Sequence, residues 1–245
     1  MIKPIKELWK EKTSDIAILL GTGSSINEIE EWDKILIHDT LAMNNWVYHP
    51  TIIPKWNSLE LKKYDYEIQK KRLEEKWNLG WKNVCFLLSS DRVFYVSGAI
   101  GHPEEARIYV YNHVIRGKHP KVNKDIKINA DFNPNDGNLY KSYDSSVTTM
   151  IHLLYLMGYK YIILYGLDMN NGLYFWSSGH PKYGLTHCRT NKDHEGRDPK
   201  SPHNAAHIKD YIIDFNNRHM IPYGREIFVG HKSTALYPHL SLWKW

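Results

Sequence analysis

The chain has 245 residues with a formal net charge of +5 at pH 7, and 42% of its residues are hydrophobic. These values are typical of a globular protein that buries a core, and so mild a positive charge does not by itself indicate a nucleic-acid-binding protein. The two cysteines, Cys85 and Cys188, do not make a disulfide framework.

The sequence contains no segment with the character of a targeting signal or a membrane span. Residues 1–8 carry charges but no apolar stretch like that of a signal peptide. No apolar run reaches the roughly 18 residues needed to cross a bilayer. We therefore expect a cytoplasmic protein whose contact with a membrane, if there is one, is peripheral and at the inner face.

An apolar run followed by a glycine turn begins the predicted fold. Ile16–Leu20 is continuously apolar, as in a parallel strand covered on both faces. Gly21 and Gly23 permit a sharp turn and the close approach of a ligand to the backbone, and Ser24 or Ser25 is suited to cap a following helix. Because such turns offer N–H groups to anions, phosphate binding is one interpretation, and a turn without a ligand is the other.

Two further strands of the predicted sheet end in asparagine. One begins at Lys34 and ends near Asn44, and the next covers residues 51–57 and ends at Asn57. Polar side chains at the carboxyl ends of parallel strands are placed to bind ligands, although asparagine also commonly makes turns. A helix over 59–77, a strand over 84–88 and a mixed region of strands and loops over 93–143 follow.

The second half of the chain continues the alternation of helices and strands. A helix is predicted from Ser146 to Met157, and the buried strand predicted over Tyr161–Asp168 ends in Gly166 and then Asp168. An acidic residue beyond a parallel strand is a standard place to bind a ribose hydroxyl or an amino group; capping or turning the chain is its alternative role. A helix over 204–215 and a strand over 227–229 complete the pattern.

These elements predict an α/β fold. We expect a single Rossmann-like domain over residues 1–245, with a mostly parallel sheet flanked by helices. Residues 170–203 are polar and show no apolar period. An excursion of that length in a compact domain is usually a functional lid or a disordered segment, and we interpret residues 170–203 as a lid-like insertion.

Histidines are concentrated in this insertion and just after it. They are His180, His187, His194, His203 and His207. A zinc site is one interpretation, because His203 and His207 are four residues apart at the start of a helix, but the spacing matches no zinc-ligand pattern. A single histidine acting as a general base is the better functional hypothesis, because imidazole titrates near neutral pH.

Short motifs along the chain, taken in order, resemble those of the bacterial CMP-sialic-acid-dependent sialyltransferases. They are Gly21-Thr22-Gly23-Ser24-Ser25, Met43-Asn44-Asn45, Asn57, Ser145-Ser146, Gly158-Tyr159-Lys160, Gly166-Leu167-Asp168, Asn171-Gly172-x-Tyr174 and His203. The resemblance covers about residues 15–240 and implies a single Rossmann-like domain with a lid and no need for a metal. A broader resemblance, to motility-accessory and pterin-pyrophosphokinase-like proteins, rests on the Gly-x-Gly-x-Ser turn.

The resemblance also implies a role for each matched residue. Residues Gly21, Thr22, Gly23, Ser24, Ser25, Asn44 and Asn57 would contact the nucleotide and phosphate of the donor, Ser145 and Ser146 would also contact the donor, and Gly166 and Asp168 would hold the nucleoside. Tyr174 would hydrogen-bond the leaving phosphate, and His203 would deprotonate the acceptor hydroxyl. The family's asparagine in the first turn is Thr22 here, and its arginine before the Thr-Ser pair is Tyr143, which leaves the transferred sugar open.

The first hypothesis for the function is therefore a metal-independent inverting glycosyltransferase that uses a nucleotide sugar, with CMP as the nucleotide. The sequence contains no Asp-x-Asp motif for a divalent metal and indicates no cofactor. The family implies a glycan as acceptor, with nucleic acid or protein as alternatives. Two other hypotheses stay open: a magnesium-dependent pyrophosphokinase of the pterin type, and a nucleotide-binding accessory protein without catalytic activity.

Overall fold

The computed structural model describes residues 2–59, 66–90, 93, 98, 100, 104–116, 138–142, 145–169, 174–176 and 205–245. Within these residues, parallel strands form one sheet in the order β1-β6-β5-β4-β3-β2-β8-β9, and β7 pairs with β6 outside this path. The strands are β1 (Ile2–Pro4), β2 (Ile16–Leu20), β3 (Asp39–Met43), β4 (Trp56–Ser58), β5 (Cys85–Ser89), β6 (Arg107–Arg116), β7 (Asn138–Ser142), β8 (Tyr161–Tyr165) and β9 (Glu226–Val229).

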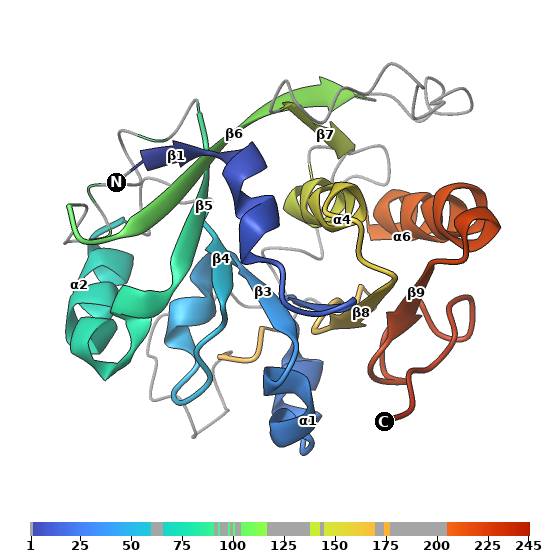
Figure 1. Cartoon of the computed structure of the whole chain (residues 1–245). Helices are drawn as coiled ribbons and strands as arrows, with labels where there is room; N and C mark the ends of the chain where they lie inside the picture. The colour runs from blue at the N-terminus through green and yellow to red at the C-terminus, as the bar shows by residue number, and fades with distance from the viewer. Residues whose placement is uncertain are drawn as a thin grey trace.

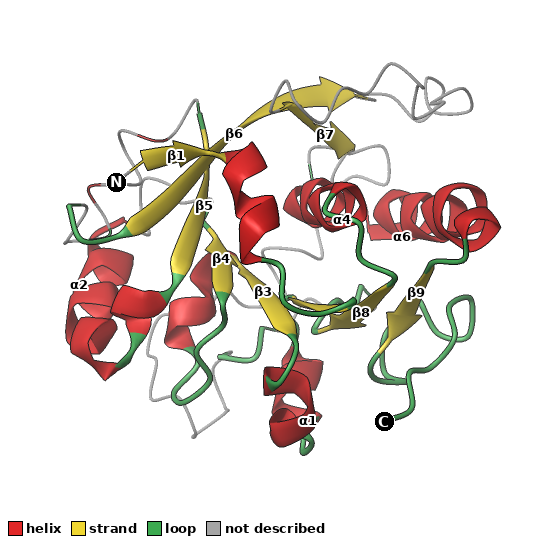
Figure 2. Cartoon of the chain, viewed as in Figure 1, coloured by secondary structure: helices red, strands yellow, loops and turns green. Residues whose placement is uncertain are grey.

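Helices cover both faces of the sheet, with α1 and α2 on one side and α4 and α6 on the other (Figures 1 and 2). The α-helices are α1 (Trp32–Leu36), α2 (Tyr66–Lys76), α4 (Ser146–Leu156) and α6 (Ala205–Phe215). The 3-10 helices are η1 (Ile5–Glu11), η2 (Ser24–Glu28), η3 (Asn44–Tyr48), η5 (Trp77–Leu79), η6 (Trp81–Asn83) and η10 (Ile221–Tyr223), and a π-helical turn, η9 (Asn216–Met220), follows α6. The predicted α/β class, with a parallel sheet flanked by helices, is confirmed.

The two faces of the sheet carry two separate hydrophobic layers. Alternate residues of a strand point to opposite faces, and in β2 Ala17 and Leu19 belong to one layer while Ile18 and Leu20 belong to the other. The first layer includes Leu8 of η1 and the apolar residues of α4 and α6. The second includes apolar residues of η3 and α2. Because both faces are covered, the central strands β2 and β8 have no charged or amide side chain, as the run Ile16–Leu20 indicated.

The strand order reverses at β2. After β2 the chain builds β3, β4, β5 and β6 in one direction along the sheet, and later returns to place β8 and β9 on the other side of β2. In open α/β sheets, ligands bind beyond the carboxyl ends of the strands at such a reversal. The connections after β2, β3, β4 and β8 therefore surround the expected binding crevice.

One strand boundary differs from prediction. The strand expected to begin at Lys34 begins at Asp39, and the preceding residues form α1, in which Ile35 is buried while the side chains of Leu36 and Ile37 are exposed. Apolar residues that remain exposed do not support a strand buried on both faces. At the N-terminus the chain forms β1 and then η1. The predicted helix 59–77 is described from Tyr66 onward.

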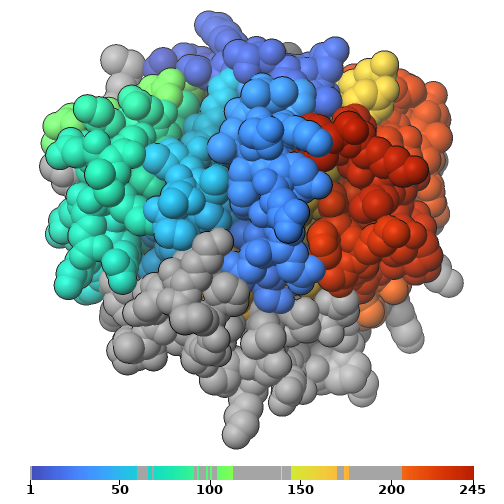
Figure 3. Space-filling view, turned by 90° about the horizontal axis from the view of Figure 1, so that it is seen from below, coloured from blue at the N-terminus to red at the C-terminus, as the bar shows by residue number. Residues whose placement is uncertain are grey.

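The C-terminal residues pack beside the N-terminal half of the chain, as Figure 3 shows for the red and blue segments. Leu242 forms a parallel bridge with Val229 of β9. The Trp245 ring stacks on His38 with a centroid distance of 5.6 Å, and its Nε1 donates to the Tyr165 hydroxyl. These contacts cover the side of β9 that does not pair with β8.

Candidate functional site

The glycine turn after β2 lies directly against the turn after β8. The backbone N–H of Gly21 donates to the carbonyl of Tyr165, and that of Gly23 donates to the carbonyl of Gly166, both at 2.8 Å. These bonds continue the β2–β8 ladder beyond the ends of the strands. Two of the predicted site segments, residues 21–25 and 166–168, thus meet at the reversal of the strand order.

Glycine is required here because the two turns approach each other so closely. A Cβ atom on Gly21 would lie 2.3 Å from the carbonyl oxygen of Gly166, and one on Gly23 would lie 2.5 Å from Oδ2 of Asp168. Gly166 has a positive φ of 66°, and a Cβ there would lie 2.6 Å from Cγ1 of Ile26. The packing of one turn on the other accounts for all three glycines without a ligand.

The Asp168 carboxylate joins the two turns through hydrogen bonds. Ser25 donates its backbone N–H to Oδ2 at 3.1 Å and its hydroxyl to Oδ1, and the Ser24 hydroxyl donates to Oδ2 at 3.2 Å. Asp168 is only 4% exposed. The Asp168 carboxylate therefore already accepts the hydrogen bond from the Ser25 N–H, which a phosphate at this turn would otherwise accept. Asp168 is a brace for the glycine turn in this structure.

The helix predicted after the turn is a short 3-10 helix, η2, and its cap differs from the prediction. Gly23 is the N-cap residue, with no side-chain cap hydrogen bond, and the first turn holds no acidic residue. Ser24 and Ser25 are inside the helix because their hydroxyls bond Asp168 rather than the free N–H groups of the helix. The prediction of a serine N-cap was wrong.

Polar groups without partners lie at the ends of β3 and β4. Asn44 follows β3 with a positive φ of 52°, a conformation that asparagine tolerates better than most residues. Asn57 is fully buried in β4, and its Nδ2 lies 3.4 Å from the Asn44 carbonyl oxygen. Within the part of the chain that the structure describes, Asn44 Oδ1, Asn57 Oδ1 and Ser58 Oγ have no hydrogen-bond partner. A buried polar atom left unpaired costs about 1–3 kcal/mol, so these atoms are suited to be completed by a ligand.

The N-terminus of α4 is directed to the same edge of the sheet. At the other end of the helix, Lys160 donates its N–H to the carbonyl of Asp15, just before β2 begins, so the C-terminal end of α4 is at the amino edge. Ser145 is the N-cap residue of α4 and is buried, but its side chain makes no cap hydrogen bond. The positive end of an eleven-residue helix therefore faces the carboxyl edge beside Ser145 and Ser146.

Tyr174 is brought to the glycine turn. It forms an antiparallel bridge with Gly23, and the next residue, Phe175, donates its N–H to the Thr22 carbonyl at 3.0 Å. The Tyr174 ring stacks on Trp176 at 4.6 Å between centroids, and Trp176 packs edge-on against Tyr48 of η3. The described part of the predicted insertion, residues 174–176, therefore contacts the glycine turn and η3.

The structure thus groups most of the predicted site residues at one edge of the sheet. Gly21 to Ser25, Gly166, Asp168 and Tyr174 form one contiguous cluster, Asn44 and Asn57 form a second, and Ser145 and Ser146 begin α4 at that edge. His203 lies outside the described residues, as do His180, His187 and His194. His207 is described, in the first turn of α6.

Sequence reasoning missed two residues. Ser58 follows Asn57 at the end of β4, and Gln69 is fully buried in α2 with neither amide atom hydrogen-bonded among the described residues. A signal for Gln69 was present. It is the one glutamine in the sequence, and it lies four residues before Leu73 on the apolar side of the predicted helix, where a polar side chain is unusual.

Two searches over the described residues were negative. No group of three or more histidine, cysteine, aspartate or glutamate side chains there is arranged to hold a metal ion. No helix in that part of the chain combines the length and the apolar character of a membrane span.

Comparisons with known proteins were made on sequence and on structure. No protein-family model matches the chain, and no curated protein matches it. It is similar in structure to the sialyltransferase CstII from Campylobacter jejuni in complex with CMP-3FNeuAc, with 11% identity over 92% of this chain and 85% of that one and a TM-score of 0.44. A CstII structure from Campylobacter jejuni with cytidine-5'-monophosphate has 12% identity over 93% of this chain and 84% of that one, with a TM-score of 0.44. A mutant of the α-2,3/8-sialyltransferase CstII has 11% identity over 93% of this chain and 86% of that one, with a TM-score of 0.41. The α/β assignment itself follows from the strand order and the parallel pairing.

Proposed function

We propose that this protein is a metal-independent inverting glycosyltransferase that takes a nucleotide sugar, CMP-linked, as its donor. The observation that supports this most directly is the pair of unpaired amide oxygens of Asn44 and Asn57 at the carboxyl ends of β3 and β4. Nucleosides and sugars carry many hydroxyl donors that such acceptors bind. The amides lie beside the strand-order reversal, where α/β sheets bind nucleotides.

The donor phosphate is proposed to bind at the N-terminus of α4, near Ser145 and Ser146. A helix N-terminus favours an anion through its partial positive charge and its free N–H groups. The Ser145 side chain is not engaged in capping. The glycine turn and Asp168 would then frame the nucleoside, with Asp168 holding the turn in shape as well as facing the donor.

In the proposed reaction an acceptor hydroxyl oxygen attacks the anomeric carbon of the sugar. The new carbon–oxygen bond forms as the bond from the anomeric carbon to the phosphate oxygen breaks, and CMP leaves. His203 would take the hydroxyl proton, and Tyr174 would donate a hydrogen bond to the departing phosphate, where negative charge develops. We propose a glycan as acceptor and a cytoplasmic location, with any membrane contact peripheral.

Ligand binding tests the donor. We expect CMP without magnesium to raise the unfolding temperature, because a ligand at 100 times its Kd stabilises a fold by about 2.7 kcal/mol. UDP, GDP, CDP and ATP, each with and without magnesium, form the comparison set. Stabilisation by ATP with magnesium alone would instead support the pyrophosphokinase hypothesis. Stabilisation by UDP alone would keep the glycosyltransferase and change the donor.

Turnover tests the base. We expect His203→Ala to retain CMP binding and to lose a factor of about 100 to 10,000 in the rate of CMP release from a CMP-linked sugar, the usual contribution of a general base. His207→Ala, four residues along the chain, is the matched control and should keep its rate. Equal turnover in both variants would remove His203 from the mechanism. Binding without turnover in the unmodified protein would support the accessory-protein hypothesis.

A further inference from the structure

Gln69 is a buried side-chain amide of α2, and no hydrogen bond compensates for its burial among the described residues. The residue is 0% exposed, and neither Nε2 nor Oε1 has a hydrogen-bond partner within the described part of the chain. Natural proteins pair almost all buried polar side-chain atoms, so a buried polar atom without a hydrogen bond requires an explanation, such as a role in binding a ligand. Gln69 offers both a donor and an acceptor for such a partner.

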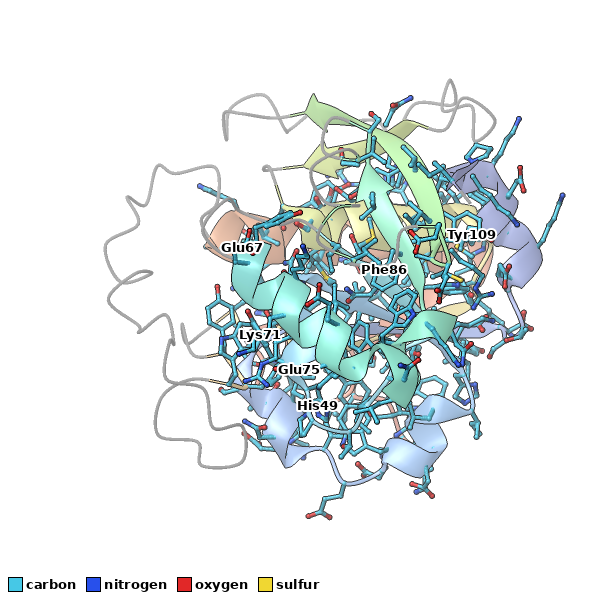
Figure 4. All side chains as sticks on the ribbon, turned by 90° about the vertical axis from the view of Figure 1, so that its left-hand side faces the viewer. His49, Glu67, Lys71, Glu75, Phe86 and Tyr109 are labelled. Carbon is cyan, nitrogen blue, oxygen red and sulfur yellow. The ribbon has the colours of Figure 1, made fainter. Side chains whose placement is uncertain are left out.

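The Gln69 side chain points from α2 toward the sheet. Residues four apart share a helix face, and Leu73 is fully buried in the hydrophobic layer that also contains Phe86 of β5. The opposite face of α2 carries Glu67, Lys71 and Glu75, which lie along the outer surface in Figure 4, with Phe86 behind the helix. Gln69 is therefore a polar group on the apolar face of the helix.

Gln69 lies about two turns from the end of α2 that contacts His49. The Lys76 ammonium donates to the His49 carbonyl, which fixes the ends of α2 and η3 relative to each other, and Figure 4 shows His49 near the end of α2 that carries Glu75. Gln69 is seven residues before Lys76, or about 10.5 Å along an α-helix.

Both helices also run in the same direction. η3 begins at the carboxyl end of β3, and α2 leads through η5 and η6 into the amino end of β5, so each runs opposite to the strands. Gln69 therefore occurs at the carboxyl edge of the sheet, on the face that carries Asn57 together with Phe86 and Ala42. Gln69 of α2, Asn44 of η3 and Asn57 of β4 therefore all belong to the part of the chain nearest the carboxyl edge of the sheet.

We propose that Gln69 binds the transferred sugar of the donor and determines which sugar is accepted; this rests on the proposed glycosyltransferase function. Neighbouring strands are about 4.8 Å apart, so β4 is about 10 Å from the glycine turn after β2. A nucleotide at the strand-order reversal would place its sugar about that far along the sheet. Sugar hydroxyls each donate and accept, which matches a side chain with both functions unpaired.

The binding of CMP and of two CMP-sugars tests this proposal. Calorimetry measures the Kd of CMP, CMP-3FNeuAc and CMP-3-deoxy-octulosonate. Each Kd is measured for the unmodified protein and for the variants Gln69→Leu and Gln69→Met. We expect both variants to bind CMP with unchanged affinity and to lose about 10-fold to 100-fold in affinity for the CMP-sugar that the unmodified protein binds better than CMP. Lys71→Met, on the outer face of α2, is the control and should change neither.

The outcomes separate this proposal from the proposed function. No binding of CMP or of either CMP-sugar by the unmodified protein contradicts the proposed function. The role of Gln69 is overturned if the unmodified protein binds CMP and neither CMP-sugar binds more tightly than CMP. It is also overturned if a folded Gln69 variant keeps the affinity of the unmodified protein for the CMP-sugar. The variants should unfold at a higher temperature than the unmodified protein, because they remove a buried unpaired amide, and Gln69→Met keeps the test open if the branched leucine does not fit.

Discussion

Two buried carboxylates stand at opposite edges of the sheet, and each organises a loop. Asp168 holds the glycine turn at the carboxyl edge. Asp39, at the start of β3, is fully buried at the amino edge and accepts hydrogen bonds from the Thr13 N–H at 2.8 Å, the Tyr159 hydroxyl at 2.6 Å and the Lys55 ammonium at 2.6 Å. Charge-assisted bonds of this kind are stronger than neutral ones. Asp39 therefore ties together the segments that precede β2, β4 and β8.

The Asp39 network makes the stability depend on pH. Burial opposes ionisation, but the hydrogen bonds from Lys55, Thr13 and Tyr159 outweigh it and hold the pKa of Asp39 below the ordinary 3.8. Because the folded pKa is lower than the unfolded one, the stabilisation is complete above about pH 5 and is lost as the pH falls past 3.8 and through the folded pKa. We expect the free energy of unfolding, measured in urea between pH 7 and pH 3, to decline over this range.

The variant Asp39→Asn should lower the free energy of unfolding at pH 7 by about 2–3 kcal/mol, because it removes the carboxylate that balances the charge of the Lys55 ammonium. It should also flatten the acid decline. Asp33→Asn changes an exposed carboxylate of α1 and is the control. An acid decline of the same steepness in Asp39→Asn and the unmodified protein would show that other groups cause it.

At the scale of elements, the contact between the turns after β2 and β8 determines the shape of the proposed site. The N–H groups of Gly21 and Gly23 are bonded across it, and the side chain of Asp168 fills the space that a Cβ on Gly23 would need. The glycines are thus conformational and steric requirements of two elements that are far apart in the sequence. Substituting one of them should displace the whole turn.

We expect Gly21→Ala to lower the free energy of unfolding by roughly 3 kcal/mol, because its Cβ would meet backbone atoms that cannot rotate away. Gly158→Ala is the matched control. Gly158 has a φ of 76° with no atom near its Cβ position, so alanine there should cost only the strain of the left-handed backbone, about 1 kcal/mol. Equal losses in the two variants, measured by urea denaturation, would exclude the close approach as the cause.

At the scale of the whole molecule, the two hydrophobic layers share one sheet. Each central strand contributes alternate residues to both layers, as Leu19 and Ile18 do in β2. If the packing against one face of the sheet is lost and the strands separate, the hydrophobic layer on the other face loses its support as well. This arrangement predicts that the layers unfold together.

We expect differential scanning calorimetry to give one transition for the chain, with a ratio of calorimetric to van't Hoff enthalpy close to unity. CMP, if it binds as proposed, should move the whole transition to a higher temperature without splitting it. Two resolved transitions, of which CMP moves one, would contradict the prediction of a single domain over residues 1–245.

Local patterns were sufficient for the elements whose character is set by their own residues. Ile16–Leu20 is a strand at its predicted bounds, and the strand predicted over Tyr161–Asp168 is observed over Tyr161–Tyr165. The helix predicted from Ser146 ends within one residue of its observed end. The reason is that burial on both faces of a parallel sheet requires an unbroken apolar run, which the sequence displays directly. The positions of Asn44, Asn57 and Tyr174 at the carboxyl edge followed from the same pattern and from the family resemblance.

The sequence by itself therefore determined the fold class, the central strands and the edge at which a site would form. Only the tertiary structure decided how the polar groups at that edge are used. Ser25 and Asp168 are 143 residues apart in the sequence, yet their hydrogen bonds occupy the turn. Gln69 is buried on the side of α2 that carries Leu73, which packs in the hydrophobic layer against the sheet. A residue type states what a side chain can bond, whereas its partner depends on which distant segment the fold brings within reach.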